Sequence, residues 1–319
     1  MNIFGTVLTY SAPSSNYRGE SAENRSVIQK ITDGRLDYAI MSPEALRNAL
    51  RDTFRSMGLP CNRERLEDRE QLAVRFEEYP DEDKYVDDFF MGWLIAAGSR
   101  ERNTILQDVA AQGRDPAKFS FRRDSVLRMN MAVAIEPYRH NTVFSQSPLN
   151  VDSPWRNADK SQLLHRETSY TAFQYPFALS VKDCEKKEDW ARSLLKAIGQ
   201  LNNAAGNHAR SYFEMAPASI VVRLTSQLVA GYSTYGFEIE KDRLRNREER
   251  HLFPEVVEGI VEGDYPANEF YLGGKLVKDM GEDTFQGLEK QGVTLCRNPQ
   301  KLLETVACKA FPEELQEGT

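Results

Sequence analysis

Three arginines are spaced so that they could bind successive phosphates of a nucleic acid. Arg47, Arg51 and Arg55 recur every four residues, and side chains at this spacing lie along one edge of an α-helix, about 6 Å apart. That distance roughly matches the phosphate spacing of an extended nucleic-acid strand. Glu44 and Asp52 interrupt the positive charge, so the same pattern also fits an ordinary solvated helix face. Support from other segments has to decide between these two interpretations.

The flanking residues predict the helix that carries this arginine stripe. Ser42 offers a side-chain oxygen that can cap the helix, and Pro43 fits the first helical position, where no N–H is needed. Glu44 follows in the positive first turn. We therefore predict a helix over residues 43–57. Its apolar face consists of Leu46, Leu50 and Phe54.

A β-hairpin is predicted immediately before this helix. Asp33 and Gly34 stand between two short β-prone runs, and this dipeptide favours the positive φ angles of a two-residue type I′ turn. Such a turn fixes the register of the two strands. The cross-strand pairs that it predicts are Ile31 with Leu36, an apolar pair, and Lys30 with Asp37, a pair of opposite charges.

Composition restricts the classes of protein to which the chain can belong. The 319 residues can bury a large core, and a hydrophobic share of 40% is ordinary for a globular protein. The net charge of −7 disfavours a protein coated in nucleic acid but allows a local basic groove. No apolar run is long enough to span a membrane, and no signal peptide is recognisable, so we expect a cytoplasmic protein. The widely separated cysteines, and the acids Asp87 and Asp88 without a third ligand nearby, lead us to expect no metal and no cofactor.

Two further segments contain residues suited to binding phosphate or RNA. Asn16 and Arg18 lie in a polar loop after the first predicted strand, a position that often carries function. Arg122 and Arg123 follow two phenylalanines, and basic residues beside aromatic rings are typical of surfaces that bind single-stranded RNA.

The predicted core elements follow the order strand, helix, strand, strand, helix, strand. They span residues 3–10, 43–57, 126–135, 168–181, 189–205 and 218–227. This order is that of the ferredoxin-like fold and of RNA-recognition motifs, so we predict an α+β fold with a β-α-β-β-α-β palm. The chain 1–319 is expected to form one such domain, with long insertions at 58–117 and 137–167 and a C-terminal extension, residues 228–319, whose role the sequence does not reveal.

Six short motifs, taken together, carry a family resemblance. They are Asn16-Tyr17-Arg18-Gly19, the hairpin Ile31-Thr32-Asp33-Gly34-Arg35 with the helix start Ser42-Pro43-Glu44-Ala45-Leu46-Arg47, Asp88-Phe89-Phe90-Met91-Gly92-Trp93, Arg122-Arg123-Asp124-Ser125, Thr171-Ala172-Phe173-Gln174-Tyr175-Pro176-Phe177 and Gly206-Asn207-His208-Ala209-Arg210. In this order and spacing they resemble the DevR-type RAMP proteins of CRISPR systems, the repeating backbone subunits of the type I Cascade complex, with subtype I-B favoured. The resemblance runs from the first strand to about Thr225.

The resemblance implies a right-hand-shaped, non-catalytic subunit that binds guide RNA (crRNA). Residues 58–117 would form the fingers, and residues 137–167 a thumb that wedges between bases. Copies would assemble head to tail along the guide, with other Cascade subunits, and present the guide for pairing with target DNA. No membrane partner is implied. The residues assigned to RNA binding are Asn16, Arg18, Ser42, Arg47, Arg51, Arg122, Arg123, Asn207, His208 and Arg210.

Two other functions remain open from the sequence. An RNA-processing endonuclease on the same scaffold needs a general acid and a general base, and His208 is the histidine best suited to serve as one of them. The remaining histidines are His140, His165 and His251. A cytosolic metabolic enzyme with an arginine-lined site for an anionic substrate is the second alternative. RNA cleavage would indicate the endonuclease, and a lack of nucleic-acid affinity would indicate the metabolic enzyme.

Overall fold

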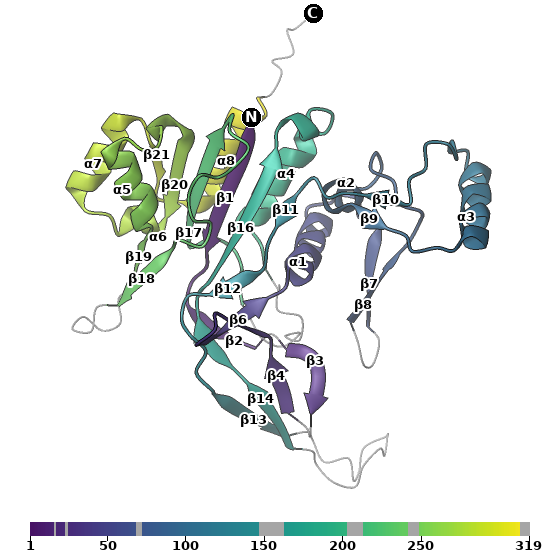
Figure 1. The fold of residues 1–319 in the computed structure, drawn as a ribbon, viewed down its shortest axis with the longest axis horizontal. Coiled ribbons are helices and arrows are strands. Elements are labelled where there is room, and N and C mark those ends of the chain that lie inside the picture. The colour runs from purple at the N-terminus through teal and green to yellow at the C-terminus, as the bar shows by residue number, and fades with distance from the viewer. Residues whose placement is uncertain are drawn as a thin grey trace, which may run out of the picture.

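The computed structural model describes residues 1–15, 17–22, 25–67, 72–146, 163–202, 213–241 and 249–312. These residues form an α+β protein built on one large sheet, with helices on both faces and two projecting groups of short strands (Figure 1). The predicted α+β class is therefore confirmed. No helix in the described ranges is both long enough and apolar enough to cross a membrane.

The first strand lies in the middle of the large sheet. β1 (Asn2–Leu8) pairs antiparallel with β16 (Phe173–Ser180) on one side and with β17 (Ser219–Thr225) on the other. Five shorter strands complete the row, namely β12 (Ala132–Ala134), β6 (Asp37–Met41) and β5 (Lys30–Thr32) beyond β16, and β20 (Phe270–Gly274) and β21 (Thr294–Cys296) beyond β17. β11 (Arg128–Met129) also pairs with β16. The C-terminal third of the chain thus extends the same sheet.

Four helices pack against one face of this sheet. They are α1 (Pro43–Ser56), α2 (Val86–Met91), α4 (Glu188–Gly199) and α8 (Pro299–Ala310), and their apolar side chains share one core with β1, β16 and β17. The predicted apolar face of α1, formed by Leu46, Leu50 and Phe54, is fully buried. Burying one such side chain stabilises the fold by about 1.5–3 kcal/mol. Burial of these three residues therefore fixes the rotation of α1 about its axis, and with it the direction in which the arginine edge faces.

The opposite face of the sheet is covered by residues 230–237 and by the helices that follow them in the chain. The hydroxyls of Tyr232 and Tyr235 donate to the backbone oxygens of Phe4, at 3.4 Å, and Met131, at 2.8 Å, so residues 230–237 cross this face. A second hydrophobic core lies here. It involves α5 (Pro254–Glu262), α6 (Lys275–Lys278), α7 (Glu282–Gln291) and the hairpin of β18 (Glu238–Lys241) and β19 (Glu249–Leu252).

Two projections extend from this body (Figure 1). The first contains the hairpin of β7 (Arg63–Glu67) and β8 (Leu72–Phe76), the pair β9 (Trp93–Leu94) and β10 (Arg122–Arg123), and α3 (Ser99–Ala111). The second is a sheet of β13 (Thr142–Gln146), β14 (Leu163–Glu167), β4 (Arg25–Ile28) and β3 (Tyr17–Ala22). β2 (Ala12–Ser14) pairs with β15 (Ser169–Thr171), and short 3₁₀ helices span Lys182–Cys184 and Ala267–Glu269. Residues 147–162 of the predicted thumb lie outside the described residues.

The predicted start of α1 is confirmed, but the register of the hairpin before it differs from the prediction. The Asp33 carboxylate accepts the backbone N–H groups of Arg35 and Leu36, both at 2.9 Å. Together with the bond from the Asp33 N–H to the Leu36 carbonyl, at 3.1 Å, these bonds place Gly34 and Arg35 at the centre of the turn, where the prediction placed Asp33 and Gly34; Gly34 has a positive φ of 99°. The observed pairs are Thr32 with Asp37, Ile31 with Tyr38 and Lys30 with Ala39. The observed register differs from the predicted one by two residues, so every side chain stays on the face of the sheet where the prediction placed it.

Several other predicted elements are shorter or divided in the structure. The strand predicted at 126–135 consists of β11 and β12, and the strand predicted at 168–181 consists of β15 and β16. Between β11 and β12, the carbonyl of Met131 accepts its hydrogen bond from Tyr235. The helix predicted at 189–205 ends at Gly199. The predicted strand 126–135 is thus divided at the point where Tyr235 binds the backbone of Met131.

Candidate nucleic-acid interface

Four arginines come together beside α1, and we refer to them as the arginine cluster. Arg47, Arg51 and Arg55 follow one edge of the helix, and Arg63 at the start of β7 lies against them. The Arg55 guanidinium donates to the backbone oxygen of Arg63. The carbonyl of Pro60, between α1 and β7, accepts the N–H of Val86 at 2.9 Å, which holds α2 beside the cluster.

Two fully buried carboxylates lie beneath the cluster, in the first turn of α2. Asp87 accepts the backbone N–H groups of Asn62, at 2.7 Å, and Arg63, at 3.2 Å. Asp88 accepts the side-chain amide of Asn62 at 2.7 Å and the N–H of Asp81 at 3.0 Å. Burial raises the pKa of Asp88. These contacts join α2 to β7 and agree with the structural role that the sequence suggested for the two acids.

Arg51 is part of this buried network. Its Nε lies 3.3 Å from Oδ2 of Asp87, its guanidinium also donates to Asn48, and only 8% of the residue is exposed. Burial lowers the pKa of Arg51 to about 10. Within this structure the guanidinium of Arg51 faces a carboxylate of its own chain, and the expected contact of Arg51 with a guide phosphate stays a prediction.

Arg47 is the member of the cluster with the most capacity for a further ligand. Its Nη1 lies 3.7 Å from the exposed Glu44, and its side chain is 23% exposed. Its Nε is buried and finds no hydrogen-bond acceptor within the described residues. Arg51 and Arg63 pair with the buried Asp87 and Asp88, whereas Arg47 and Arg55 pair with the exposed Glu44 and Glu77, whose attraction water and salt screen.

Two further predicted residues lie near the start of α1. The hydroxyl of Ser42 accepts the N–H of Ala45 at 3.2 Å and caps the helix. Arg18 lies in β3, which pairs with β4, and the carbonyl of Gln29 just after β4 accepts the N–H of Ile40 at 3.0 Å. The backbone that carries Arg18 is thus connected to the strand that leads into Ser42. Asn16 and the side chain of Arg18 do not belong to the described part of the structure.

Arg122 and Arg123 occupy β10, in the first projection. Arg122 is exposed and pairs with Asp124 at 3.2 Å. Arg123 forms an ion pair with Glu82, donates to the carbonyl of Phe89 and packs over the Trp93 ring at 5.9 Å. The side chain of Arg123 is therefore committed to contacts within the projection, whereas that of Arg122 faces outward.

The predicted RNA-binding residues Asn207, His208 and Arg210 lie outside the described residues. Of the other histidines, His140 contacts Thr142 at 3.0 Å and His165 packs against the Phe144 ring. His251 is buried against the hydroxyl of Ser219 at 2.8 Å, and burial lowers its pKa to about 4. Within the described ranges, no three or more His, Cys, Asp or Glu residues form a metal-binding group.

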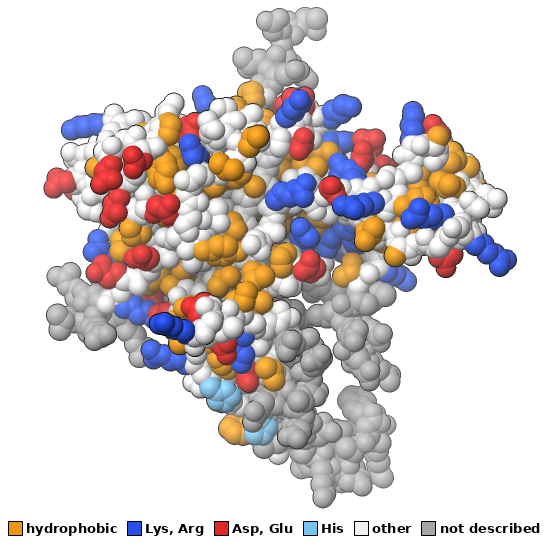
Figure 2. Space-filling model, in the orientation of Figure 1, with side chains coloured by type: hydrophobic (Ala, Val, Ile, Leu, Met, Phe, Trp, Pro, Cys, Tyr) orange, Lys and Arg blue, Asp and Glu red, His pale blue; other side chains and the backbone are white. Residues whose placement is uncertain are grey.

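The charges are distributed unevenly over the surface. Figure 2 shows Lys and Arg side chains gathered over the region of α1, α2 and β11, whereas Asp and Glu side chains are prominent over the lobe of α5 and α7. Residues 254–291, which include that lobe, contain nine acidic and three basic residues. This segment alone accounts for most of the net charge of −7, and it lies on the sheet face opposite the arginine cluster.

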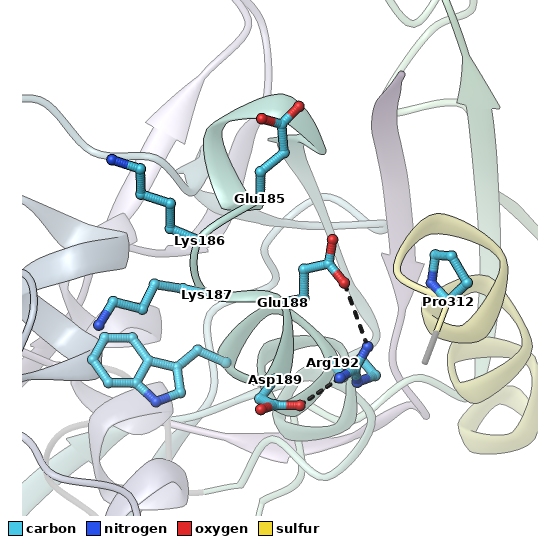
Figure 3. Close-up of a pocket in the computed structure, with 8 residues that line it drawn as sticks. Glu185, Lys186, Lys187, Glu188, Asp189, Arg192 and Pro312 are labelled. Atoms are coloured by element: carbon cyan, nitrogen blue, oxygen red, sulfur yellow. Dashed lines mark hydrogen bonds and ion pairs between the residues drawn. The ribbon is translucent and has the colours of Figure 1, made fainter. Parts of the chain in front are cut away.

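A hollow at the start of α4 is not a comparable site. Figure 3 shows that Arg192 points toward Glu188 and Asp189, while Lys186 and Lys187 extend in another direction. Arg192 also donates to the carbonyl of Phe311 at 2.8 Å. The hollow is lined by three acidic and three basic side chains, so these side chains carry no net charge.

Arg63 is central to the cluster but was not among the predicted site residues. It lies in the predicted insertion 58–117, in a segment that no hydrophobic period marks. Burial lowers the pKa of Arg63, and the guanidinium lies 3.7 Å from Oδ1 of Asp88. Since Asp88 is 25 residues away in the chain, no local pattern could have revealed this pairing.

Comparison with known proteins identifies a relative that covers almost the whole chain. No family model matches the sequence. Over 316 residues the chain is 27% identical to a protein of Myxococcus xanthus (strain DK1622) named "CRISPR-associated protein Cas7/Cst2/DevR", with 95% of this chain and 98% of that protein covered. The chain is thus similar to this Cas7/Cst2/DevR protein over almost its whole length. The resemblance drawn from the six sequence motifs is thereby confirmed.

Solved structures agree with this relationship at the level of the fold. A chain of a "CRISPR RNA-guided surveillance complex, pre-nicking" superposes with a TM-score of 0.56 at 11% identity, covering 98% of this chain and all of that one. A chain of a "CRISPR RNA-guided surveillance complex" superposes with a TM-score of 0.53 at 10% identity and the same coverage. The protein therefore shares its fold with chains of such complexes.

Proposed function

We propose that this protein is a non-catalytic, guide-RNA-binding subunit that repeats along the backbone of a Cascade-type CRISPR complex in the cytoplasm. The kinship with a Cas7/Cst2/DevR protein suggests the assembly, and the arginine cluster suggests how the chain holds RNA. The observation that carries the proposal is the buried Nε of Arg47, which has no acceptor in the described part of the chain. A phosphate oxygen would supply one.

We interpret the central strands as a ferredoxin-like palm. In sheet order, β17, β1, β16 and β12 are antiparallel neighbours, and the crossovers that include α1 and α4 pack on one face. Residues 58–117 would then be the fingers, and residues 137–167 the thumb. Because residues 230–237 cover the opposite face, the guide would run along the α1 edge instead of stacking on an open sheet as in an RNA-recognition motif.

The proposed contacts position the guide without reading its sequence. Arg47 and Ser42 at the start of α1, with Arg18 nearby and Arg122 on the fingers, would contact phosphates, while Arg51 would hold the fingers in place. Phosphate contacts fix register and orientation, whereas base pairing supplies specificity. The guide would therefore select the target DNA, and copies of this chain would follow one another along it beside other subunits.

The endonuclease alternative receives less support. His208, its proposed acid or base, lies outside the described residues, and His251 is 1% exposed with a lowered pKa. We therefore propose that bound RNA is held and not cut.

An RNA-binding measurement with matched variants tests this proposal. Single-stranded RNA of one fixed length is titrated with wild-type protein and with Arg47→Ala across a range of salt concentrations, and the RNA is checked for cleavage. We expect sequence-tolerant binding without cleavage, weakened about 3- to 10-fold by Arg47→Ala, with a salt slope smaller by about 1. Lys290→Ala removes an exposed charge from α7, which packs on the other face, and should change neither value.

Two results would overturn the proposal. One is the absence of RNA binding, even when the chain is co-expressed with guide RNA and partner subunits. The other is RNA cleavage that the purified wild-type protein performs and His208→Ala abolishes.

A further inference from the structure

Two adjacent apolar side chains protrude from the loop after β17. Leu228 is 87% exposed and Val229 is 64% exposed, and we refer to this pair as the apolar prong. Single exposed apolar residues are common on protein surfaces. The prong is unusual because its two members follow each other at a loop tip that is held in place on both sides.

The chain before and after the prong is fixed by side-chain contacts. The carbonyl of Gln227 accepts the side-chain amide of Asn2 at 2.8 Å, and the carbonyl of Ala230 accepts Nη1 of Arg223 at 2.7 Å. Gly231 has a φ of 76°, and a Cβ atom added there would lie 2.5 Å from the same Nη1. A loop held in this way has little conformational freedom to lose when a partner covers its tip.

A second exposed apolar pair lies beyond the other end of the central strands. Val143 and Phe144 on β13 are 54% and 61% exposed. β17 ends beside the start of β1, whereas β16 starts beside the end of β1 and is preceded in the chain by β13, β14 and β15. The prong and this pair are therefore at opposite ends of the molecule's central strands, and Figure 1 shows β13 far from the end of β17 near the N-terminus.

We propose that the prong of one copy packs against Val143 and Phe144 of the next copy. This inference rests on the proposed assembly along RNA. A head-to-tail array needs two different surfaces that complement each other, and the two exposed apolar pairs at opposite ends meet that requirement. The contact can be small, because RNA already holds neighbouring copies at a high effective concentration.

Charged substitutions in the prong test the contact. Leu228→Asp combined with Val229→Asp is compared with Val261→Asp, which alters a similarly exposed apolar residue (56%) on α5. Each protein is titrated with a short RNA that holds one copy and with one several times longer, and the mass of the complexes is measured. We expect the prong variant to bind the short RNA within 2-fold of wild type but to bind the long RNA at least 10-fold more weakly and without multi-copy complexes. The control should behave as wild type does.

Site-specific crosslinking tests the partner surface. Leu228→Cys is introduced into one preparation and Phe144→Cys into another, both also carrying Cys308→Ser to remove an exposed thiol. On the long RNA, oxidation should link the two preparations when they are mixed, and should link neither preparation by itself.

The outcomes separate this contact from the proposed function. Wild-type protein that binds no RNA would overturn the proposed function. Wild-type protein that binds long RNA only as single copies would overturn the array and the contact with it. Multi-copy assembly that survives the prong substitutions, or mixed preparations that do not crosslink, would overturn the contact alone.

Discussion

Buried arginines anchor two regions of this molecule, the base of the fingers and the base of the prong. At the fingers, Arg51 lies 3.3 Å from Asp87, which binds the start of β7. At the prong, Arg223 lies 2.7 Å from Glu269 and donates to the carbonyl of Ala230. In each case one guanidinium joins a protruding segment to the body. The two regions differ in whether their polar atoms are satisfied.

The prong network is closed. Arg223 uses Nε and Nη2 for Glu269 and Nη1 for Ala230, and the other oxygen of Glu269 accepts the hydroxyl of Thr225 at 2.9 Å. The finger network is open, because three of its buried polar atoms find no hydrogen-bond partner within the described residues. These atoms are Nε of Arg47, Nε of Arg51 and Oδ1 of Asp88. A closed network can only stabilise the fold, whereas an open one whose unpartnered atoms include two arginine donors can also accept an anion.

Removing the guanidinium of Arg51 should have the largest effect. Arg51→Ala leaves the carboxylate of Asp87 fully buried without its ion-pair partner, and breaking such a pair costs about 3–5 kcal/mol. Urea denaturation would measure the free energy of unfolding. Arg55→Ala is the control on the same edge, and its partly exposed pair with Glu77 should contribute less than about 1 kcal/mol. Equal stabilities for the two variants would contradict the structural role of Arg51.

Removing the guanidinium of Arg223 should have an intermediate effect. Arg223→Ala should lower the free energy of unfolding by about 2 kcal/mol, less than for Arg51, because the Glu269 side chain is 21% exposed and water can partly solvate it. Affinity for the short RNA should stay within 2-fold of wild type, while assembly on the long RNA should weaken as the prong loosens. Arg250→Ala, which removes an exposed pair with Glu240, is the matched control. A loss of short-RNA binding in folded Arg223→Ala would remove the distinction between the two networks.

Removing the carboxylate beside Arg47 should have the smallest effect, and in the opposite direction. Glu44→Gln leaves the guanidinium without its exposed partner at 3.7 Å, so RNA binding should tighten about 2-fold at low salt and return toward wild type at high salt. Glu258→Gln on α5, on the opposite sheet face, should leave the affinity unchanged. Weaker RNA binding by Glu44→Gln would show that phosphate does not compete with this carboxylate.

Local features were predictable where neighbouring residues determine the backbone. Ser42, Pro43 and the spacing of Leu46, Leu50 and Phe54 predicted α1, because capping and helical periodicity act within a few residues. Gly34 correctly indicated a turn with positive φ. The register of that turn was not predictable from the dipeptide, because the Asp33 carboxylate accepts the backbone N–H groups of Arg35 and Leu36, and Gly34 and Arg35 become the central residues in place of Asp33 and Gly34.

The sequence by itself determined the α+β class, the helix with its row of arginines and the motifs that relate the chain to the Cas7/Cst2/DevR proteins. Only the tertiary structure decided what each arginine does. Arg47 and Arg51 have the same side chain one helical turn apart, yet Arg51 forms a buried ion pair with Asp87, which is distant in sequence, whereas Arg47 pairs with the exposed Glu44. The four-residue spacing of the arginines predicts which side chains share an edge of α1. It does not predict which carboxylates lie opposite them, because Asp87 belongs to α2, a distant segment of the chain.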